Sequence, residues 1–318
     1  MKIVVLDGYS LNPGDLSWKG LEELGETTVY DRTDSSDILK NIGDAQAIFT
    51  NKTPLDANTL AQMENVRYIG VLATGYNIVD VEAAASRGIT VTNVPGYGTA
   101  AVAQFTMALL LELCHHIGDH GAAVRAGEWA RSADFTFHNH PLMELEGKTM
   151  GIIGMGSIGM AVARLARTFG MNVVYYGRNR KKAAEFRGFA YKELDELLSI
   201  SDVVSLHCPL TDETRGMIDS AAIGLMKPTA LLINTSRGPV VNESDLANAL
   251  NDGRIAGAAL DVLSKEPPEE DNPLQKAANC LVTPHIAWAA FEARRRLMDA
   301  AIDNFRSFIK GNPVNKVN

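Results

Sequence analysis

Several common features are missing from this sequence of 318 residues. It has only three cysteines, Cys114, Cys208 and Cys280, and none belongs to a CxxC motif. We interpret them as reduced, buried thiols of a cytoplasmic protein rather than as a disulfide framework. We find neither an internal repeat of short period nor a low-complexity segment, which argues against a solenoid fold and long disordered regions.

Long apolar runs and excess positive charge are also absent. No stretch approaches the roughly 18 consecutive apolar residues that a membrane span requires, so we expect no membrane insertion. The N-terminus, MKIVVLDGYS, has a four-residue apolar run before Asp7, which indicates a buried strand rather than a signal peptide. The net charge of −8 argues against extensive binding to nucleic acid.

What is present is an alternation of short apolar runs with helical stretches, which predicts an α/β fold with mostly parallel strands. The chain length suggests about two domains. We expect a long apolar helix over 100–117, a loop or arm over 118–147, and a last helix from about 287 to 310. The expected strands are 2–6, 45–49, 68–72, 89–93, 149–153, 172–176, 202–206, 230–234, 257–261 and 279–283.

A glycine-rich turn follows one of these strands. The stretch GIIGMGSIGMAVARLARTFG places Gly154, Gly156 and Gly159 in a GxGxxG pattern before an amphipathic helix. The first glycine permits the tight turn, the second leaves room for a pyrophosphate, and the third lets helix and strand pack closely. Free N–H groups and the helix dipole then face the phosphates. In this setting the pattern predicts a dinucleotide site, although a plain tight turn can carry the same glycines.

An acid is missing where a dinucleotide fold usually has one. At the end of the next strand, Asp or Glu would hydrogen-bond the ribose hydroxyls of NAD and repel the extra phosphate of NADP. This chain has Gly177 there, followed by Arg178, Arg180, Lys181 and Lys182. Because Arg178 and Arg180 can bind a 2′-phosphate, we favour NADP over NAD. The alternative is that RNRKK is only the solvated start of a helix.

Reactive residues follow three further strands. Arg237 comes after ALLIN, His285 comes after NCLV, and Glu266 lies five residues beyond Asp261, which ends GAALD. The carboxyl ends of parallel strands lie at one edge of a sheet, and ligands bind there. We therefore expect an Arg, a Glu and a His to converge on one crevice with the nicotinamide.

That combination suits hydride transfer to a 2-keto acid. Arg237 can hold the carboxylate and polarise the keto oxygen. His285 can donate the proton that this oxygen needs, and Glu266 can orient His285 and favour its protonated form. Each residue alone has a plainer interpretation, as an arginine in a surface turn, a packed core histidine or a solvated glutamate.

The chain resembles the D-isomer-specific 2-hydroxyacid dehydrogenases over essentially its whole length. The resemblance rests on GIIGMGSIG, LLINTSRGPVVNESDL, GAALDVLSKEPP and LVTPHIAW. It implies that Arg237, Glu266 and His285 are catalytic, and that backbone amides at Thr74 and Gly75 receive the substrate carboxylate. Besides the glycine turn, the positions that it assigns to the dinucleotide are Ser157, Ile158, Cys208, Pro209, Thr235, Ser236 and Asp261.

The resemblance also implies two Rossmann-like domains, of which one is discontinuous. Residues 1–98 and 288–318 would form the substrate-binding domain, and residues 99–287 the dinucleotide-binding domain. The long helix from Ala100 matches the family's dimer-forming region, which implies a homodimer.

Within the family, the chain is most similar to glycerate dehydrogenases, also called hydroxypyruvate reductases, in LDGYSLNPGDLSW, TPHIAWAA and GNPVNKV. Formate dehydrogenases match poorly because they carry Gln where this chain has Glu266. The resemblance therefore implies reduction of hydroxypyruvate, and of glyoxylate, to D-glycerate and glycolate with a reduced nicotinamide. The chain departs from the family pattern in having Gly177 where an acid is expected, and this argues against strict use of NAD.

Two other functions remain open. The substrate would be a bulkier 2-keto acid if residues such as Tyr76 and Trp288 shape a wider pocket. A dinucleotide-sensing protein like the corepressors related to this family would show little turnover. We expect none of the extra tails that those proteins carry, which favours the enzyme.

Histidines outside the strand ends raise the question of a metal. His138 and His140 have a spacing that a metal can use, but no Cys or acid motif completes the set. His115, His116 and His120 lie near the end of the long helix and allow the same interpretation. From the sequence we expect no metal site.

Overall fold

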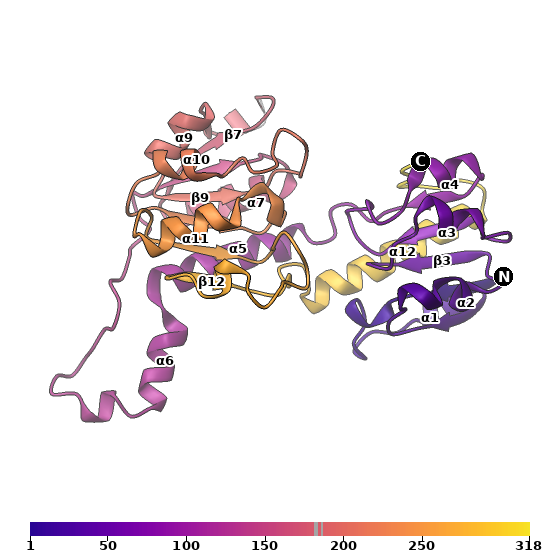
Figure 1. Ribbon diagram of the computed structural model, residues 1–318, viewed down its shortest axis with the longest axis horizontal. Coiled ribbons are helices and arrows are strands. Elements are labelled where there is room, and N and C mark those ends of the chain that lie inside the picture. Colours follow the sequence, from indigo (N-terminus) through magenta and orange to yellow (C-terminus); the bar gives the residue numbers. More distant parts are fainter. Residues whose placement is uncertain (181–183, 186) are drawn as a thin grey trace. The chain divides into compact units, whose positions relative to one another are not determined.

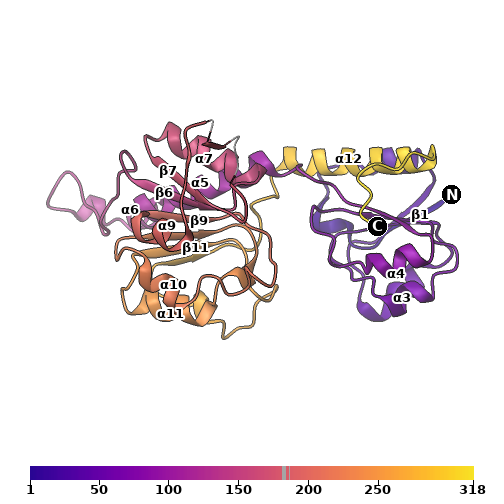
Figure 2. The same ribbon diagram turned by 90° about the horizontal axis from the view of Figure 1, so that it is seen from above.

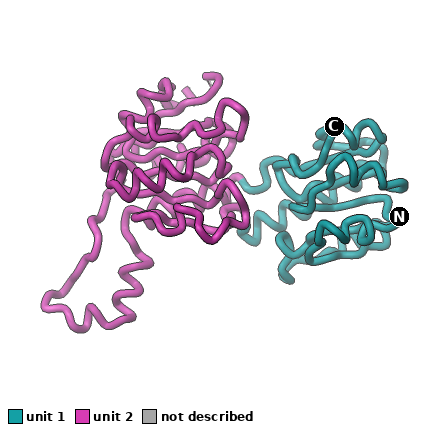
Figure 3. Tube along the Cα trace, viewed as in Figure 1, with its two compact units in different colours: residues 1–98, 289–318 teal, residues 99–288 magenta. Residues whose placement is uncertain are grey.

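The structure is a computed structural model that describes residues 1–180, 184–185 and 187–318. The chain forms two compact units (Figure 3). Unit 1 comprises Met1–Gly98 and Ala289–Asn318, and unit 2 comprises Thr99–Trp288. The chain therefore leaves unit 1 once and returns to it for its last helix.

Unit 1 contains a five-stranded parallel sheet in the order β2-β1-β3-β4-β5. The strands are β1 (Lys2–Val5), β2 (Glu26–Val29), β3 (Ala47–Thr50), β4 (Tyr68–Val71) and β5 (Thr90–Thr92). The helices are η1 (Gly8–Ser10), α1 (Lys19–Glu22), η2 (Ser35–Asp37), α2 (Ile38–Ile42), α3 (Ala57–Ala61), α4 (Val81–Ser86) and α12 (Phe291–Ile309). Four of these strands agree with the expected apolar runs. The edge strand β2 does not, because its sequence ETTV is only exposed or half-buried.

The sheet of unit 1 is covered on both faces (Figure 2). On one face α12 packs through Phe305, whose ring centroid lies 4.8 Å from that of Tyr68 and 5.5 Å from that of Phe49. On the other face, α2, α3 and α4 contribute Ile38, Leu60 and Ala84 to a second buried cluster. The last helix is thus part of the core of the N-terminal unit.

Unit 2 contains a seven-stranded parallel sheet in the order β12-β11-β10-β9-β6-β7-β8. The strands are β6 (Thr149–Ile153), β7 (Asn172–Tyr176), β8 (Ala190–Tyr191), β9 (Val203–Leu206), β10 (Leu231–Asn234), β11 (Gly257–Leu260) and β12 (Cys280–Val282). The helices are α5 (Thr99–His115), α6 (Ile117–Arg125), η3 (Trp129–Arg131), α7 (Ser157–Thr168), α9 (Leu194–Ile200), α10 (Ser220–Leu225), η4 (Gly238–Val240), α11 (Glu243–Asn251) and η5 (Pro273–Gln275). All the expected strands of this half are present. No apolar run predicts β8, which has only two residues.

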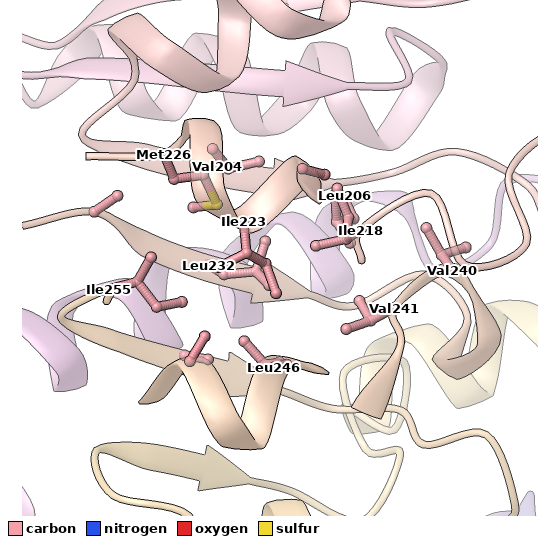
Figure 4. Close-up of a cluster of buried hydrophobic side chains, with 14 of the residues drawn as sticks. Val204, Leu206, Ile218, Ile223, Met226, Leu232, Val240, Val241, Leu246 and Ile255 are labelled. Atoms are coloured by element: carbon pink, nitrogen blue, oxygen red, sulfur yellow. The ribbon is translucent and has the colours of Figure 1, made fainter. Parts of the chain in front are cut away.

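Helices cover both faces of this sheet as well (Figure 2). Val162 of α7 and Leu110 of α5 are buried against one face. On the other face, Ile223 of α10 and Leu246 of α11 pack against Leu232 of β10 (Figure 4). The prediction of an α/β fold with two parallel sheets is therefore confirmed. The strand order also changes direction beside β6, where β9 and β7 flank it, and such a switch point is where doubly wound folds bind ligands.

The segment 118–147, predicted as a loop or arm, begins with a helix that the sequence analysis did not expect. The long helix ends at His115, and a second helix, α6, follows after one residue and runs from Ile117 to Arg125. The sequence hides α6 because Gly118 and Gly121 weaken the helical pattern. Among the described residues, no single helix is long and apolar enough to cross a membrane. Only α5 and α6 taken together pass that test of length and composition, and they are bent by 57° at their junction.

Candidate active site

The glycine turn joins β6 to α7 as the sequence predicts. Gly154 has a φ of +99°, and a Cβ there would lie 2.5 Å from the carbonyl carbon of His207. A Cβ on Gly159 would lie 2.2 Å from the carbonyl oxygen of Gly154, so helix and turn are in close contact. Only glycine fits these two positions without a shift of the backbone.

The first turn of α7 faces open space. Gly156 is its N-cap and makes no side-chain capping bond, and a Cβ there would meet nothing within 4 Å. Ser157 and Ile158 follow as the first helical residues, and Ser157 is exposed. Uncapped N–H groups at the positive end of a helix bind anions. The turn therefore fits the pyrophosphate of a dinucleotide.

The segment after β7 carries the two arginines. Arg178 is exposed, and its Nη2 forms an ion pair at 2.8 Å with Oε2 of Glu213, which is also exposed. The guanidinium of Arg180 lies 4.7 Å from the ring centroid of Tyr191. Exposed ion pairs of this kind contribute only about 0–1 kcal/mol, so Arg178 can exchange its partner. Lys181 and Lys182 of the same predicted run lie outside the described residues.

A buried asparagine shapes the turn that follows β10. Oδ1 of Asn234 accepts hydrogen bonds from the N–H and the hydroxyl of Ser236, at 3.0 and 2.8 Å. Its Nδ2 donates to the carbonyl oxygen of Arg237 at 2.9 Å. Thr235 joins the turn to α5 through a 3.0 Å bond with the hydroxyl of Thr106. Asn234 therefore fixes the backbone that presents Arg237, whose guanidinium is exposed and donates to the Ser236 carbonyl.

The turn with Arg237 touches the loop that carries Glu266. A Cβ on Gly238 would lie 2.0 Å from the carbonyl carbon of Leu263, so the two backbones are in direct contact. The N–H of Leu263 in turn donates to Oε1 of Glu266 at 3.1 Å. Arg237 and Glu266 thus belong to adjoining loops at the carboxyl end of the sheet.

The predicted His and Glu are in direct contact. Nδ1 of His285 lies 2.6 Å from Oε2 of Glu266, and the two side chains are 29% and 33% exposed. A carboxylate can only accept, so Nδ1 carries a proton. Nε2 is then the nitrogen that can exchange a proton with a ligand, as a donor in the imidazolium and an acceptor in the neutral ring.

The backbone of His285 adopts a left-handed conformation, with φ of +54°. Such a conformation is uncommon for a residue with a Cβ, and it persists where the surroundings enforce it. Here the carbonyl oxygen of His285 accepts the indole N–H of Trp288 at 2.9 Å, and its N–H donates to the carbonyl oxygen of Thr283 at 3.0 Å. Trp288 therefore packs against the loop that carries the histidine.

Asp261 holds that same loop from within the core. Its Oδ1 accepts the hydroxyl of Thr283 at 2.7 Å and the N–H of Ile286 at 2.9 Å, and its Oδ2 accepts the N–H of Ala287 at 2.8 Å. The side chain is 1% exposed, and this burial raises the pKa of Asp261 despite the three bonds. The resemblance assigns Asp261 to the dinucleotide, and the structure adds that it anchors the His285 loop.

The residues after β9 stay uncharged. Protein atoms enclose the ring of His207, and this desolvation lowers its pKa to about 3, although the residue as a whole is half-buried. Its Nε2 lies 2.8 Å from the hydroxyl of Ser205. Burial raises the pKa of the Cys208 thiol to about 11, and Pro209 beside it is exposed. His207 is therefore neutral at neutral pH and carries no proton to give up as an acid.

The other thiols and the predicted substrate loop belong to other segments of the chain. Burial raises the pKa of Cys114 to about 11 and that of Cys280 to about 12, and Cys280 is half-buried rather than fully buried. Thr74 and Gly75 follow β4 in unit 1. The hydroxyl of Thr74 donates to the carbonyl oxygen of Val94 at 2.9 Å.

Sequence reasoning missed two positions that shape this site. Asn234 is fully buried, and Gly238 leaves no room for a Cβ beside Leu263. Both positions shape the site through the backbone and are not assigned to the reaction itself. The signal for Asn234 was a polar residue ending an otherwise apolar strand, ALLIN, directly before Ser-Arg-Gly. Gly238 gave no separate signal, because the contact with Leu263 joins residues far apart in the chain.

Known proteins resemble this chain in sequence and in fold. Residues 107–287 match the family described as D-isomer specific 2-hydroxyacid dehydrogenase, NAD binding domain. A hydroxypyruvate reductase of Blautia hydrogenotrophica is 54% identical over 100% of both chains. A glycerate dehydrogenase of Methylorubrum extorquens is 37% identical over 99% of this chain and 98% of its own.

A solved structure extends the similarity to the fold. The NADPH-dependent glyoxylate/hydroxypyruvate reductase of Sinorhizobium meliloti, in complex with NADP and malonate, superimposes with a TM-score of 0.84. It is 30% identical, and the match covers 99% of this chain and 96% of that one. These similarities make the chain an oxidoreductase that uses a nicotinamide dinucleotide. The predicted resemblance is thus confirmed, and the chain belongs to the D-isomer-specific 2-hydroxyacid dehydrogenase family.

Proposed function

We propose that this enzyme reduces hydroxypyruvate and glyoxylate to D-glycerate and glycolate, with His285 as the acid and base. The observation that carries the proposal is the 2.6 Å contact between His285 Nδ1 and Glu266 Oε2 at the carboxyl end of the sheet. The names of the relatives, a hydroxypyruvate reductase and a glycerate dehydrogenase, support the choice of substrate.

The reaction divides the work between the coenzyme and the protein. A bound reduced nicotinamide supplies a hydride to the keto carbon. His285 gives the proton on Nε2 to the keto oxygen, and in the reverse direction it takes this proton back. Glu266 keeps Nδ1–H in place throughout and stabilises the imidazolium form that donates.

Arg237 holds the substrate in our proposal. Its planar guanidinium is exposed on a rigid turn, where it can bind the carboxylate through two N–H groups and polarise the keto oxygen. By the family resemblance, backbone amides at Thr74 and Gly75 are further candidates for binding a substrate carboxylate. Unit 1 accordingly supplies the substrate-binding domain, and residues 99–287 of unit 2 supply the dinucleotide-binding domain.

The coenzyme is held along the carboxyl ends of β6, β9, β10 and β11. Gly154, Gly156 and Gly159 leave room for the pyrophosphate at the start of α7, where Ser157 and Ile158 offer N–H groups. Further contacts to the adenosine and nicotinamide come from Cys208, Pro209, Thr235, Ser236 and Asp261.

We further propose a preference for NADPH. Gly177 has no carboxylate to repel a 2′-phosphate, and Arg178 and Arg180 are near enough in the chain to bind it together. The 2′-phosphate would replace Glu213 as the partner of Arg178, which is feasible because that ion pair is exposed. The opposite preference would arise if Glu213 stood in for the missing acid and accepted the ribose hydroxyls of NAD.

The deciding experiment compares kcat/KM for hydroxypyruvate with NADPH and with NADH. Turnover with either supports the proposed reaction, and the ratio measures the coenzyme preference. Efficient turnover of only bulkier 2-keto acids, such as phenylpyruvate, would replace the proposed substrate. An absence of turnover across a panel of 2-keto acids would favour a corepressor-like binding protein instead.

We also infer a cytoplasmic homodimer. The three cysteines are all free, which suits a reducing compartment. Light scattering of the purified protein tests the dimer, and a monomeric mass would contradict it.

A further inference from the structure

The proposed reaction assigns no role to one arm of unit 2. We use the word arm for residues 116–142, which comprise α6, η3 and an extended return to the sheet (Figure 1). The arm is closed at its base, because the N–H of Met143 donates to the carbonyl oxygen of Cys114 at 3.0 Å. The outgoing and the returning chain are therefore neighbours at this point.

Three potential metal ligands meet near that base. His116, Asp119 and His140 each offer one ligand atom, and these atoms all lie within 4.8 Å of one another. Nε2 of His140 is 3.3 Å from Oδ2 of Asp119, and the rings of His116 and His140 stack with centroids 4.2 Å apart. The sequence concealed this set, since twenty residues lie between Asp119 and His140.

A fourth histidine holds the return segment in place. Nδ1 of His120 lies 2.8 Å from the carbonyl oxygen of His116 and must donate to it, and Nε2 accepts the N–H of Asn139 at 3.2 Å. Both ring nitrogens of His120 are thus engaged, so it is a support rather than a ligand. It fixes the backbone one residue before His140. Through these two bonds His120 ties the backbone of His116 to the segment that carries His140.

The backbone of His116 provides an independent indication. This residue lies between α5 and α6 in the left-handed conformation, with φ and ψ both 46°. Glycine or asparagine usually occupies such a position at a helix end, because a Cβ is strained there. A histidine at a strained position points to a use for its side chain.

We propose that His116, Asp119 and His140 bind a zinc ion that clamps the base of the arm. Two imidazoles and one carboxylate are ligands that Zn²⁺ prefers, and a water molecule completes the tetrahedron. Hard cations such as Mg²⁺ and Ca²⁺ take oxygen ligands and do not suit two imidazoles. Binding draws the three ligand atoms to about 3.3 Å from one another. Rotation of the side chains achieves this, because Asp119 is exposed and both histidines are half-buried.

The test uses full-length protein without a histidine tag, freed of metal with EDTA and titrated with ZnCl₂ in a calorimeter. We expect one zinc ion per chain with a Kd of about 10 μM or below, a higher melting temperature, and slower cleavage of the arm by trypsin. Co²⁺ in place of zinc should give the visible absorption of a tetrahedral site. If no zinc bound, the three side chains would only contact one another without a metal, and the proposal would be overturned.

Variants locate the ion. H116N, which suits the left-handed backbone, D119N and H140Q should each weaken zinc binding about tenfold or more. H138Q is the matched control, because His138 is exposed on the same segment and lies outside the cluster. All four variants should retain hydroxypyruvate turnover and their circular dichroism spectra. Unchanged binding in H140Q, or loss of binding in H138Q, would place the ion elsewhere and contradict the site.

Discussion

The two ends of the proposed nucleotide crevice are built differently. After β10, β11 and β12, buried side chains fix the loops: Asn234 holds the turn of Arg237, and Asp261 holds the loop of His285. After β7, the contacts of Arg178 and Arg180 are on the surface, to Glu213 and Tyr191. Bond making requires groups placed to a fraction of an ångström, whereas a phosphate can be bound by charges that rearrange. The first end should therefore tolerate substitution far less than the second.

The largest effect is expected for H285A. It removes the group that we assign to proton transfer, and general acid–base catalysis contributes about 10²- to 10⁴-fold. We expect kcat for hydroxypyruvate to fall in that range while the Kd for NADPH, measured by fluorescence titration, stays the same. Turnover near that of the wild type would remove His285 from this role.

E266Q is the companion variant. Glutamine can still accept a hydrogen bond from Nδ1, but it cannot stabilise the positive charge of the imidazolium. We expect a loss of kcat for hydroxypyruvate that is smaller than the loss in H285A. A kcat equal to that of the wild type would contradict the role that we assign to Glu266.

The next effect in size is expected for R237A, which removes both the anchor for the carboxylate and the polarising charge. We expect KM to rise and kcat to fall, with a combined loss in kcat/KM of about 10²-fold or more. R237K keeps the charge but loses the planar fork, so it should recover only part of the loss. Kinetics unchanged in R237A would contradict the assignment.

D261N tests the buried anchor. The NH₂ group of asparagine would face groups that now donate hydrogen bonds to Asp261. A buried donor left without an acceptor costs roughly 1–3 kcal/mol. We expect kcat to fall about tenfold and the melting temperature to fall as well. D202N is the matched control, since Asp202 accepts Thr149 N–H and Lys227 Nζ at the amino ends of the strands. D202N should lower only the melting temperature, and an equal loss of kcat there would mean that D261N acts through general destabilisation.

The smallest effect is expected for R178A, because the contact of Arg178 with Glu213 lies on the surface. Removing one exposed charge contact should lower the ratio of kcat/KM for NADPH over NADH by about fivefold, equivalent to roughly 1 kcal/mol. R306A is its control, because Arg306 forms a similar exposed ion pair with Asp303 in unit 1. If R178A changed this ratio by more than the tenfold loss of kcat expected for D261N, the two ends of the crevice would not differ in their tolerance of substitution.

Much of the fold was predictable because parallel strands with both faces covered have continuous apolar runs. Runs such as TMGII and NVVYY coincide with β6 and β7. β2 could not be recognised, since ETTV at a sheet edge has no such run, and the glycines in α6 masked a helix. The pattern of apolar residues records burial, and it is weakest where an element lies at an edge or projects from the core.

For the candidate site, the sequence predicts which residues lie near one another but not how their loops are held. The apolar runs of β10 and β12 predicted that Arg237 and His285 lie at the same edge of the sheet, because the carboxyl ends of parallel strands meet there. The anchoring bonds of Asn234 and Asp261 were not visible, since hydrogen-bond partners depend on how each loop folds back. The meeting of His116 with His140 was hidden for the same reason.

The contact between Gly238 and Leu263 constrains how this enzyme can be engineered. Even a methyl group at position 238 would lie 2.0 Å from a backbone carbon and force the two loops apart. Libraries aimed at new substrates should therefore leave residues 234–238 and 261–263 unaltered. Diversity belongs at side chains outside these two segments, and Trp288, whose indole N–H donates to the carbonyl oxygen of His285, is the first position to vary.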